Sequence, residues 1–279
     1  MSFIIKGAGA YINTTLAGNI QPVVNSFIPT DLGSKLTLWL DEREQTTTIL
    51  GGNPYINFWG DQQTLTGPHD MSDTGGYVGP LPGKTINGYA APEFKRATLI
   101  NPTRMQSSGS ATPLWHMEDI ITATSYHVFA VVNIADIQTD SPNGQANEGI
   151  IQGGNGWYPL CYRNNSGNPQ MTVGHYSDTS PTGFRTLTVS GLPLNTDVLL
   201  ETWFDGSNIQ ACIANGSVSS LSAGNVGITL STDLLYLGTG NSYNVSASLG
   251  SLIICDQALN EADRASVRQY LGTKYNVVY

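Results

Sequence analysis

The sequence predicts a mainly β protein, a two-sheet antiparallel sandwich that is closed by one C-terminal helix and preceded by an N-terminal arm. Three observations support this fold class. Short runs of β-branched and aromatic residues recur between turns rich in Gly, Asn and Pro, as a two-sheet sandwich requires. Charged residues make up 12 % of the chain, against roughly 25 % in an ordinary soluble domain. Residues 260–275 alone show a convincing helical pattern.

Residues 1–35 differ from the rest of the chain. Their short apolar pieces are separated by Gly, Asn and Pro and show no helical period. We interpret this segment as an arm that attaches the domain to a partner protein or to a neighbouring subunit. The alternative is that it packs as an extra strand on its own domain.

The sandwich itself is predicted to span residues 36–279. It begins with the alternating, β-rich run at 36–41. Residues 64–85 are crowded with Gly, Pro, Asp and Ser, which predicts a long surface loop. Residues 126–133 are largely apolar on both alternating sides, which predicts a central strand.

Turn signals place the strands of the second half of the chain. The runs 156–163 and 170–177 are predicted to be neighbouring strands, because an Asn- and Gly-rich turn joins them. Asp205-Gly206 and Asn215-Gly216 are predicted hairpin turns on either side of a strand.

The C-terminal stretch is predicted to be a strand followed by a helix. The apolar run 252–255 suits a strand that is covered on both faces. Asn260 is an N-cap with Asp263 placed to complete a capping box. Val267 and Leu271 share one helical face, which must dock on the sandwich. Gly272 is expected to end the helix.

This segment resembles the end of laminin-G-like, concanavalin A-like jelly-roll domains from bacteria and their phages. Those domains commonly close with a Leu-Ser/Asn-Glu-x-[DE]-R stretch, a Tyr-Leu pair and a Lys-Tyr pair. The matching residues here are Leu259, Asn260, Glu261, Arg264, Tyr270, Leu271, Lys274 and Tyr275. Further pieces of the resemblance, in the same order as in the group, are Trp39-Leu40-Asp41, Trp59-Gly60-Asp61, Asn87-Gly88, Pro92 and Phe94. The resemblance implies a jelly-roll fold and a habit of glycan or surface binding, but no single activity.

Composition excludes several classes of function. A net charge of −9 argues against a general nucleic-acid binder, which needs clustered Lys and Arg. No apolar run approaches the length of a membrane span, so no membrane partner is expected. The three cysteines are too few for a disulfide framework and are predicted to be buried thiols, although one pair could bridge.

Catalytic and metal motifs are also missing from the sequence. No Glu-x-Asp-x-Glu or Glu-x-Asp-x-x-Glu strand is present, so the usual β-glucan hydrolase arrangement is disfavoured. The four histidines form no zinc motif. No cofactor is expected, although loop aspartates leave calcium open as a ligand: Asp70, Asp73, Asp136 and Asp140.

Glycan sites usually combine aromatic faces with hydrogen-bonding side chains, because the apolar face of a sugar stacks while its hydroxyls need partners. Two predicted neighbouring strands supply such a group, and the predicted ligand-binding residues are Trp157, Tyr158, Tyr162, Arg163, His175 and Tyr176. The same region carries the alternative of a polysaccharide lyase. In that hypothesis, the His175-Tyr176 pair would act with Arg163, Gln170 and Arg185.

The leading hypothesis is a non-enzymatic virion structural protein of a phage, either a tail or head appendage or a decoration protein. It would display the jelly-roll domain to a host surface or glycan, contact other virion proteins through its arm and form a homo-oligomer. A composition typical of extracellular proteins without a visible export signal favours release by lysis. The alternatives are a polysaccharide lyase or glycoside hydrolase, and a cellular, extracellular lectin-like adhesion module.

Overall fold

The computed structural model describes most of the chain, with gaps in the N-terminal segment and at several connections. The described residues are 3–7, 10–14, 27–43, 45–50, 53–62, 69–73, 79–95, 105–107, 116–137, 148–153, 157–165, 167–177, 183–223, 228, 234–238 and 246–279. No helix among them is long and apolar enough to cross a membrane.

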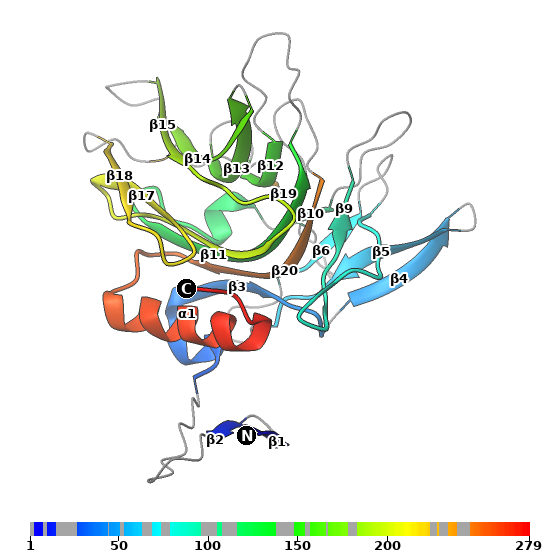
Figure 1. Ribbon diagram of the computed structural model, residues 1–279. Helices are drawn as coiled ribbons and strands as arrows, with labels where there is room; N and C mark the ends of the chain where they lie inside the picture. The colour runs from blue at the N-terminus through cyan, green and yellow to red at the C-terminus, as the bar shows by residue number, and fades with distance from the viewer. Residues whose placement is uncertain are drawn as a thin grey trace.

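Two antiparallel sheets form the sandwich, as predicted (Figure 1). The larger sheet runs, in spatial order, through β15 (Gly183–Ser190), β14 (Asn168–Ser177), β13 (Trp157–Asn165), β12 (Glu148–Gly153), β19 (Leu235–Leu237), β10 (Met105–Ser107), β6 (Met71–Asp73), β5 (Asn53–Trp59) and β4 (Gln45–Leu50). The smaller sheet runs through β18 (Ser219–Ser222), β17 (Asn208–Ile213), β16 (Asp197–Phe204), β11 (Tyr126–Asp136), β20 (Ser246–Cys255) and β3 (Leu36–Leu40), and β9 (Glu93–Phe94) also pairs with β20.

The remaining elements are short, apart from one helix. Two small hairpins are β1 (Phe3–Gly7) with β2 (Ala10–Thr14), and β7 (Thr85–Ile86) with β8 (Tyr89–Ala90). Two 3₁₀ helices are η1 (Pro29–Lys35) and η2 (Met117–Asp119), and the α-helix is α1 (Glu261–Tyr275).

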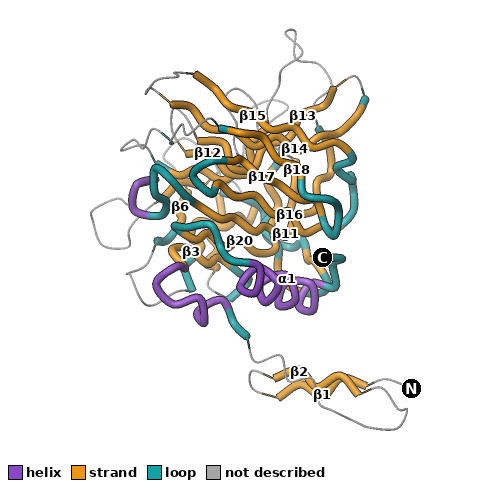
Figure 2. Tube along the Cα trace, turned by 90° about the vertical axis from the view of Figure 1, so that its left-hand side faces the viewer, coloured by secondary structure: helices purple, strands orange, loops and turns teal. Residues whose placement is uncertain are grey.

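The central strand β11 separates two hydrophobic layers, which confirms the prediction from its two apolar sides. Val128, Ala130 and Val132 face the larger sheet and belong to the core between the sheets. Phe129 and Val131 point the opposite way and pack in a second cluster with Val267 of α1. The seven-stranded sheet is therefore buried on both faces, between the larger sheet and α1 (Figures 1 and 2).

Helix α1 begins where the sequence predicts and ends later. The Asn260 side chain accepts a hydrogen bond from the Asp263 amide at 3.0 Å, which confirms the N-cap. The prediction that Gly272 ends the helix is wrong, because the helix continues to Tyr275 and Asn276 closes it with a φ of 54°. Gly272 instead leaves space for a ring that packs on the helix. A Cβ there would lie 1.9 Å from the Tyr279 ring, which crosses the helix at this point.

Residues 1–35 are described only in part. Strands β1 and β2 pair with each other and, among the described strands, with nothing else. Figures 1 and 2 both place this hairpin beyond α1, away from the sandwich. The packed body begins before Leu36, because Phe27 and Leu32 already belong to the cluster under α1.

The predicted loop at 64–85 requires a correction. It contains β6, which pairs with β5 and β10, and His69, Asp70 and Met71 are buried. Its other described part, 79–85, includes the bridge at Leu81 and the start of β7. The predicted hairpins at Asp205 and Asn215 and the strand pair β13–β14 are confirmed. All three cysteines are buried free thiols, so no pair bridges.

Three of the residues that carry the resemblance, Asp41, Asn87 and Lys274, meet in one cluster near the C-terminal end of α1. The Asp41 carboxylate contacts Lys274 Nζ at 3.2 Å and Arg43 at 2.7 Å. Lys274 Nζ also lies 2.7 Å from the Glu42 carboxylate. The backbone carbonyl of Lys274 accepts a hydrogen bond from the side-chain amide of Asn87 at 2.9 Å. These contacts join α1 to the end of β3. They bring together three pieces that lie far apart in the sequence: Trp39-Leu40-Asp41, Asn87-Gly88 and Lys274-Tyr275.

Gly238 provides a stability prediction. Its φ is +78°, and a Cβ would lie 2.1 Å from the buried Phe94 ring. We expect Gly238→Ala to lower the free energy of unfolding by more than about 2 kcal/mol, because strain and overpacking add. Gly191→Ala is the matched control, since its φ is +84° with nothing within 4 Å of a Cβ. Urea titration of both variants measures the difference, and equal losses would refute the packing argument.

Candidate functional site

The predicted aromatic group divides between the two faces of the larger sheet. Strands β13 and β14 are neighbours, and Trp157 lies opposite His175 in their register. Trp157, Tyr162 and His175 each have 0 % of their surface exposed. They point into the core, where the His175 ring lies 4.8 Å from Phe204. These three rings therefore present no face to a ligand, and as placed they are core residues.

The outward members of the group are Arg163 and Tyr176. Tyr176 contacts Phe184 of β15, with ring centroids 5.6 Å apart, and Phe184 is 51 % exposed. Tyr158 lies opposite Gly174 on the same ladder, but its side chain is outside the described part of the chain. A ligand role for this group stays a prediction, and only its outward side chains are placed to take part.

The lyase constellation is not assembled. Residues directly opposite on antiparallel strands share a face, so Arg185 lies on the inner face with His175. Gln170 and Arg163 lie opposite each other on the outer face, together with Tyr176. The backbone of the sheet thus separates the histidine from the tyrosine and from one arginine. This geometry does not support a lyase site at these residues, because a saccharide cannot reach the buried His175.

The aspartates considered for calcium do not gather. Asp70 is buried, and its carboxylate accepts a hydrogen bond from the backbone N–H of Asp61 at 3.0 Å. It thereby holds the segment after β5 to the segment before β6. Asp73 lies in β6 and Asp136 ends β11, whereas Asp140 falls outside the described residues. Among the described residues, no three His, Cys, Asp or Glu side chains form a metal-binding cluster. Calcium binding remains an untested prediction.

A buried charge cluster lies between α1 and the smaller sheet. Glu201, only 2 % exposed, accepts from Arg264 Nε and Arg268 Nε at 2.7 Å each. His127 Nδ1 accepts the Leu259 amide at 3.2 Å, so Nε2 carries the proton and donates to Glu201 at 2.8 Å. Arg264 also lies 3.9 Å over the Trp203 ring.

The electrostatics of this cluster are set by burial and by the two arginines. Burial opposes ionisation of Glu201, but hydrogen bonds from His127 and Arg264 and the charge of Arg264 outweigh it and lower its pKa to about 2. Burial also lowers the pKa of His127, despite the neighbouring carboxylate. Glu201 is therefore ionised and His127 neutral at pH 7. The cluster holds the helix and leaves the carboxylate no room for a substrate.

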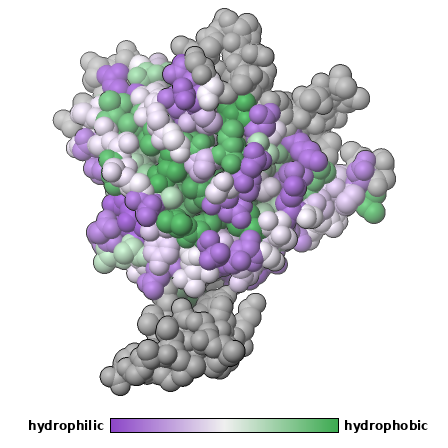
Figure 3. Space-filling view, viewed as in Figure 1, coloured by the Kyte–Doolittle hydropathy of each residue, from purple (hydrophilic) through white to green (hydrophobic). Residues whose placement is uncertain are grey.

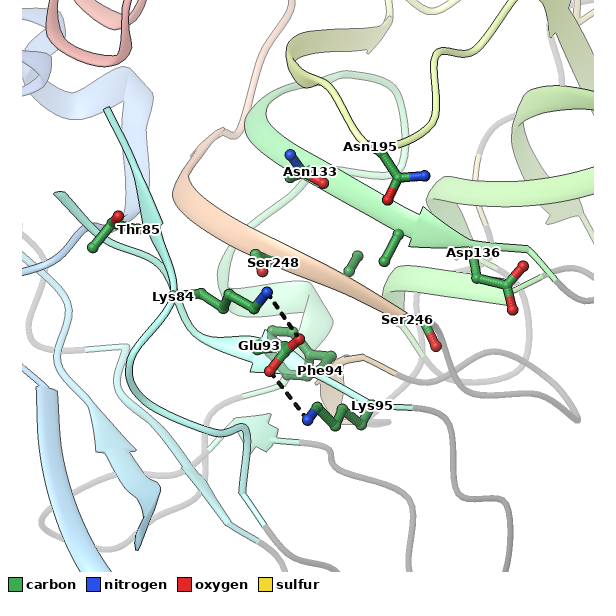
Figure 4. A pocket seen from close by; sticks show the side chains of 12 residues that line it. Lys84, Thr85, Glu93, Phe94, Lys95, Asn133, Asp136, Asn195, Ser246 and Ser248 are labelled. Atoms are coloured by element: carbon green, nitrogen blue, oxygen red, sulfur yellow. Dashed lines mark ion pairs between the residues drawn. The ribbon is translucent and has the colours of Figure 1, made fainter. Parts of the chain in front are cut away.

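A surface cavity of about 420 Å³ lies where β9, β11 and β20 meet (Figure 4). Asn133 lies two residues after Val131 on β11, so both side chains point to the same face of the smaller sheet. Val131 packs under α1, and the cavity is therefore on the face that α1 covers further along. Polar side chains from five segments converge there: Lys84, Glu93, Lys95, Asn133, Asp136, Asn195, Ser246 and Ser248.

Local backbone features place these side chains. The register between β11 and β20 shifts between Ile134 and Asp136, which is the kind of bulge that re-aims a side chain. Asn195 has a φ of 54°, a conformation that asparagine tolerates well, and its amide donates to the Ile134 carbonyl at 2.7 Å. Its side chain is thereby held beside Asn133 at the rim of the cavity (Figure 4).

The charges of the cavity are balanced. Glu93 lies between Lys95 at 3.4 Å and Lys84 at 3.8 Å, and both lysines are largely exposed. Asn133 donates to Asp197 at 2.7 Å. The only aromatic residue of the lining, Phe94, is buried. The cavity therefore offers many hydrogen bonds and no stacking surface, which suits an uncharged polyhydroxylated ligand.

The sequence patterns do not predict this cavity. Of its lining residues, Asp136 was considered for calcium, and Phe94 belongs to the family resemblance. The available signal was a set of Asn, Ser and Asp residues at the ends of predicted strands. Such residues are equally common in plain turns, so only the pairing of β20 with both β9 and β11 brings them together.

Comparisons with known proteins identify the fold. No family model matches the sequence, and no curated protein matches it. The binding domain of Paraclostridial Mosquitocidal Protein 1 has a TM-score of 0.59 at 9 % identity, over 89 % of this chain and 54 % of that chain. A structure of botulinum neurotoxin type C, whose uptake depends on interaction with two ganglioside molecules, has a TM-score of 0.57 at 12 % identity, over 87 % and 52 %.

The binding domain of botulinum neurotoxin DC, solved in complex with SialylT, gives a TM-score of 0.55 at 10 % identity, over 85 % of this chain and 51 % of that chain. This chain spans about half the length of each of these solved chains. At such low identity, the likeness establishes a shared β-sandwich fold, and these neighbours are binding domains of toxins.

Proposed function

We propose that the protein is a non-catalytic glycan-binding module that contacts carbohydrate through the cavity between β9, β11 and β20. The observation that carries the proposal is the convergence of neutral and balanced polar side chains on one cavity of about 420 Å³. The hydroxyl groups of a sugar need hydrogen-bond partners, and this cavity supplies them from five segments of the fold. The neighbouring toxin domains that are described with gangliosides or SialylT support a glycan ligand.

We further propose that the module is carried on a phage virion, with the N-terminal segment before Phe27 as its attachment to other virion proteins. The support is the β1–β2 hairpin, which among the described strands pairs only with itself. Proteomic analysis of purified particles tests this part of the proposal, and absence of the chain from them would exclude it. The other possibility is an extracellular adhesion module.

Glycan-array binding tests the function. We expect the intact chain to bind at least one class of oligosaccharide, and we expect Asp136→Ala with Ser246→Ala to weaken that binding by roughly tenfold or more, because each lost hydrogen bond contributes about 1 kcal/mol. Phe184→Ala on the outer face of β15 is the matched control and should leave affinity unchanged. Loss of binding in Phe184→Ala alone would move the site to the Tyr176–Phe184 face.

A further inference from the structure

We propose that β4 is a self-pairing edge through which two copies of this chain join their larger sheets into one continuous sheet. This interaction is independent of the glycan-binding proposal. Strand β4 is the last strand of the nine-stranded sheet, and among the described strands its outer edge has no partner. The backbone N–H and C=O groups of every second residue along this six-residue strand therefore face outward.

The other sheet edges are protected. On β3, the backbone N–H of Trp39 donates a hydrogen bond to the Asp61 carboxylate at 2.9 Å. The Trp39 carbonyl accepts one from the backbone N–H of Gln62 at 2.7 Å, so the segment at 61–62 covers that edge. Strand β18 has only four residues. Strand β15 carries Arg185 and contacts β17 and β18 of the facing sheet, which closes the sandwich there (Figure 1).

Strand β4 has no charged or proline residue to keep its edge from pairing, and the register shift between Thr46 and Thr47 places the extra residue on β5, not on the open edge. Its sequence, QTTTIL, is rich in β-branched residues. Thr46, Thr47 and Ile49 are exposed, with Ile49 at 73 %. The β4–β5 hairpin projects sideways from the body, and hydrophobic surface marks its outer end (Figures 1 and 3). A partner can therefore approach this edge without meeting another of the described strands.

A second copy fits this edge because antiparallel pairing of β4 with itself is self-complementary. A twofold axis perpendicular to the sheet at Thr47 keeps each side chain on its own face and sets Thr47 opposite the partner's Thr47. The same axis places Gln45 opposite the partner's Ile49. Threonine pairs across antiparallel strands are favourable, and no like charges meet although each copy has a net charge of −9.

Disulfide trapping tests the register directly. Paired residues on the axis have Cα atoms about 4.5–5.5 Å apart, within reach of a disulfide. We expect Thr47→Cys to form a covalent dimer under mild oxidation. Thr188→Cys on the exposed face of edge strand β15 is the matched control and should stay monomeric. The native cysteines do not interfere because all three are buried.

Sedimentation velocity across a concentration series tests the association itself. The intact chain should dimerise, and Thr47→Lys should weaken dimerisation by roughly tenfold or more, because two lysines would oppose each other at the axis. Thr188→Lys should have no effect. A chain that stays monomeric at all concentrations would overturn the proposal. So would a dimer that survives Thr47→Lys and is lost when residues 1–26 are removed.

Discussion

Replacing Glu201 with Ala is expected to lower the free energy of unfolding by about 3–5 kcal/mol, because it leaves two arginines without their shared carboxylate under α1. Arg264 and Arg268 both bond to Glu201 at 2.7 Å. His127 would lose the acceptor of its Nε2 proton at the same time. Urea unfolding monitored by circular dichroism measures the loss.

Glu261→Ala is the matched control for this prediction. Glu261 bonds to the same two arginines, at 2.9 and 3.0 Å, but its side chain is largely exposed. Exposed ion pairs contribute less than about 1 kcal/mol. If Glu201→Ala and Glu261→Ala cost the same, burial of the carboxylate would not be what makes the cluster important, and α1 would be held by its apolar face alone.

Acid is expected to destabilise the protein through the same cluster, by about 3 kcal/mol. The pKa of Glu201 is lowered from 4.5 to about 2, so the unfolded chain binds more protons than the folded chain between these values. Its contribution is complete above pH 4.5 and is lost as the pH falls towards 2. The pKa of His127 is also lowered by burial, so a further loss of stability begins as the pH falls through the ordinary histidine value of 6.5.

Glu201→Gln isolates this effect. The amide keeps the shape of the side chain but has no proton to gain, so stability of the variant should vary less between pH 4.5 and pH 2 than that of the intact protein. Chemical denaturation at a series of pH values measures both curves. Parallel curves for the two proteins would show that other carboxylates cause the acid sensitivity.

The strands and the helix could be predicted because their signals are local. The two apolar sides of 126–133, the Asp-Gly and Asn-Gly turns and the Asn260 cap each depend on neighbouring residues. The end of the helix was predicted wrongly, since Gly272 serves the Tyr279 ring and Asn276 supplies the left-handed residue. A glycine that admits a ring looks the same in the sequence as one that stops a helix.

The candidate site could not be predicted because it depends on pairing between distant strands. Alternation along β13 and β14 sends Trp157 and His175 inward and Tyr176 outward, but the sequence alone does not say which side is the core. Aromatic residues on these strands are consistent with either face. The cavity joins residues from 84 to 248, and no local pattern connects them.

Asp41, Asn87 and Lys274, which carry part of the resemblance to jelly-roll domains, are bonded together inside the molecule, and Arg264 is bonded to Glu201 in a separate buried cluster. None of the four lines the cavity between β9, β11 and β20. Substitutions at these four positions are therefore expected to change the stability of the fold and to leave the shape of the cavity intact. The resemblance that they carry is a guide to how the chain folds and not to which ligand it takes.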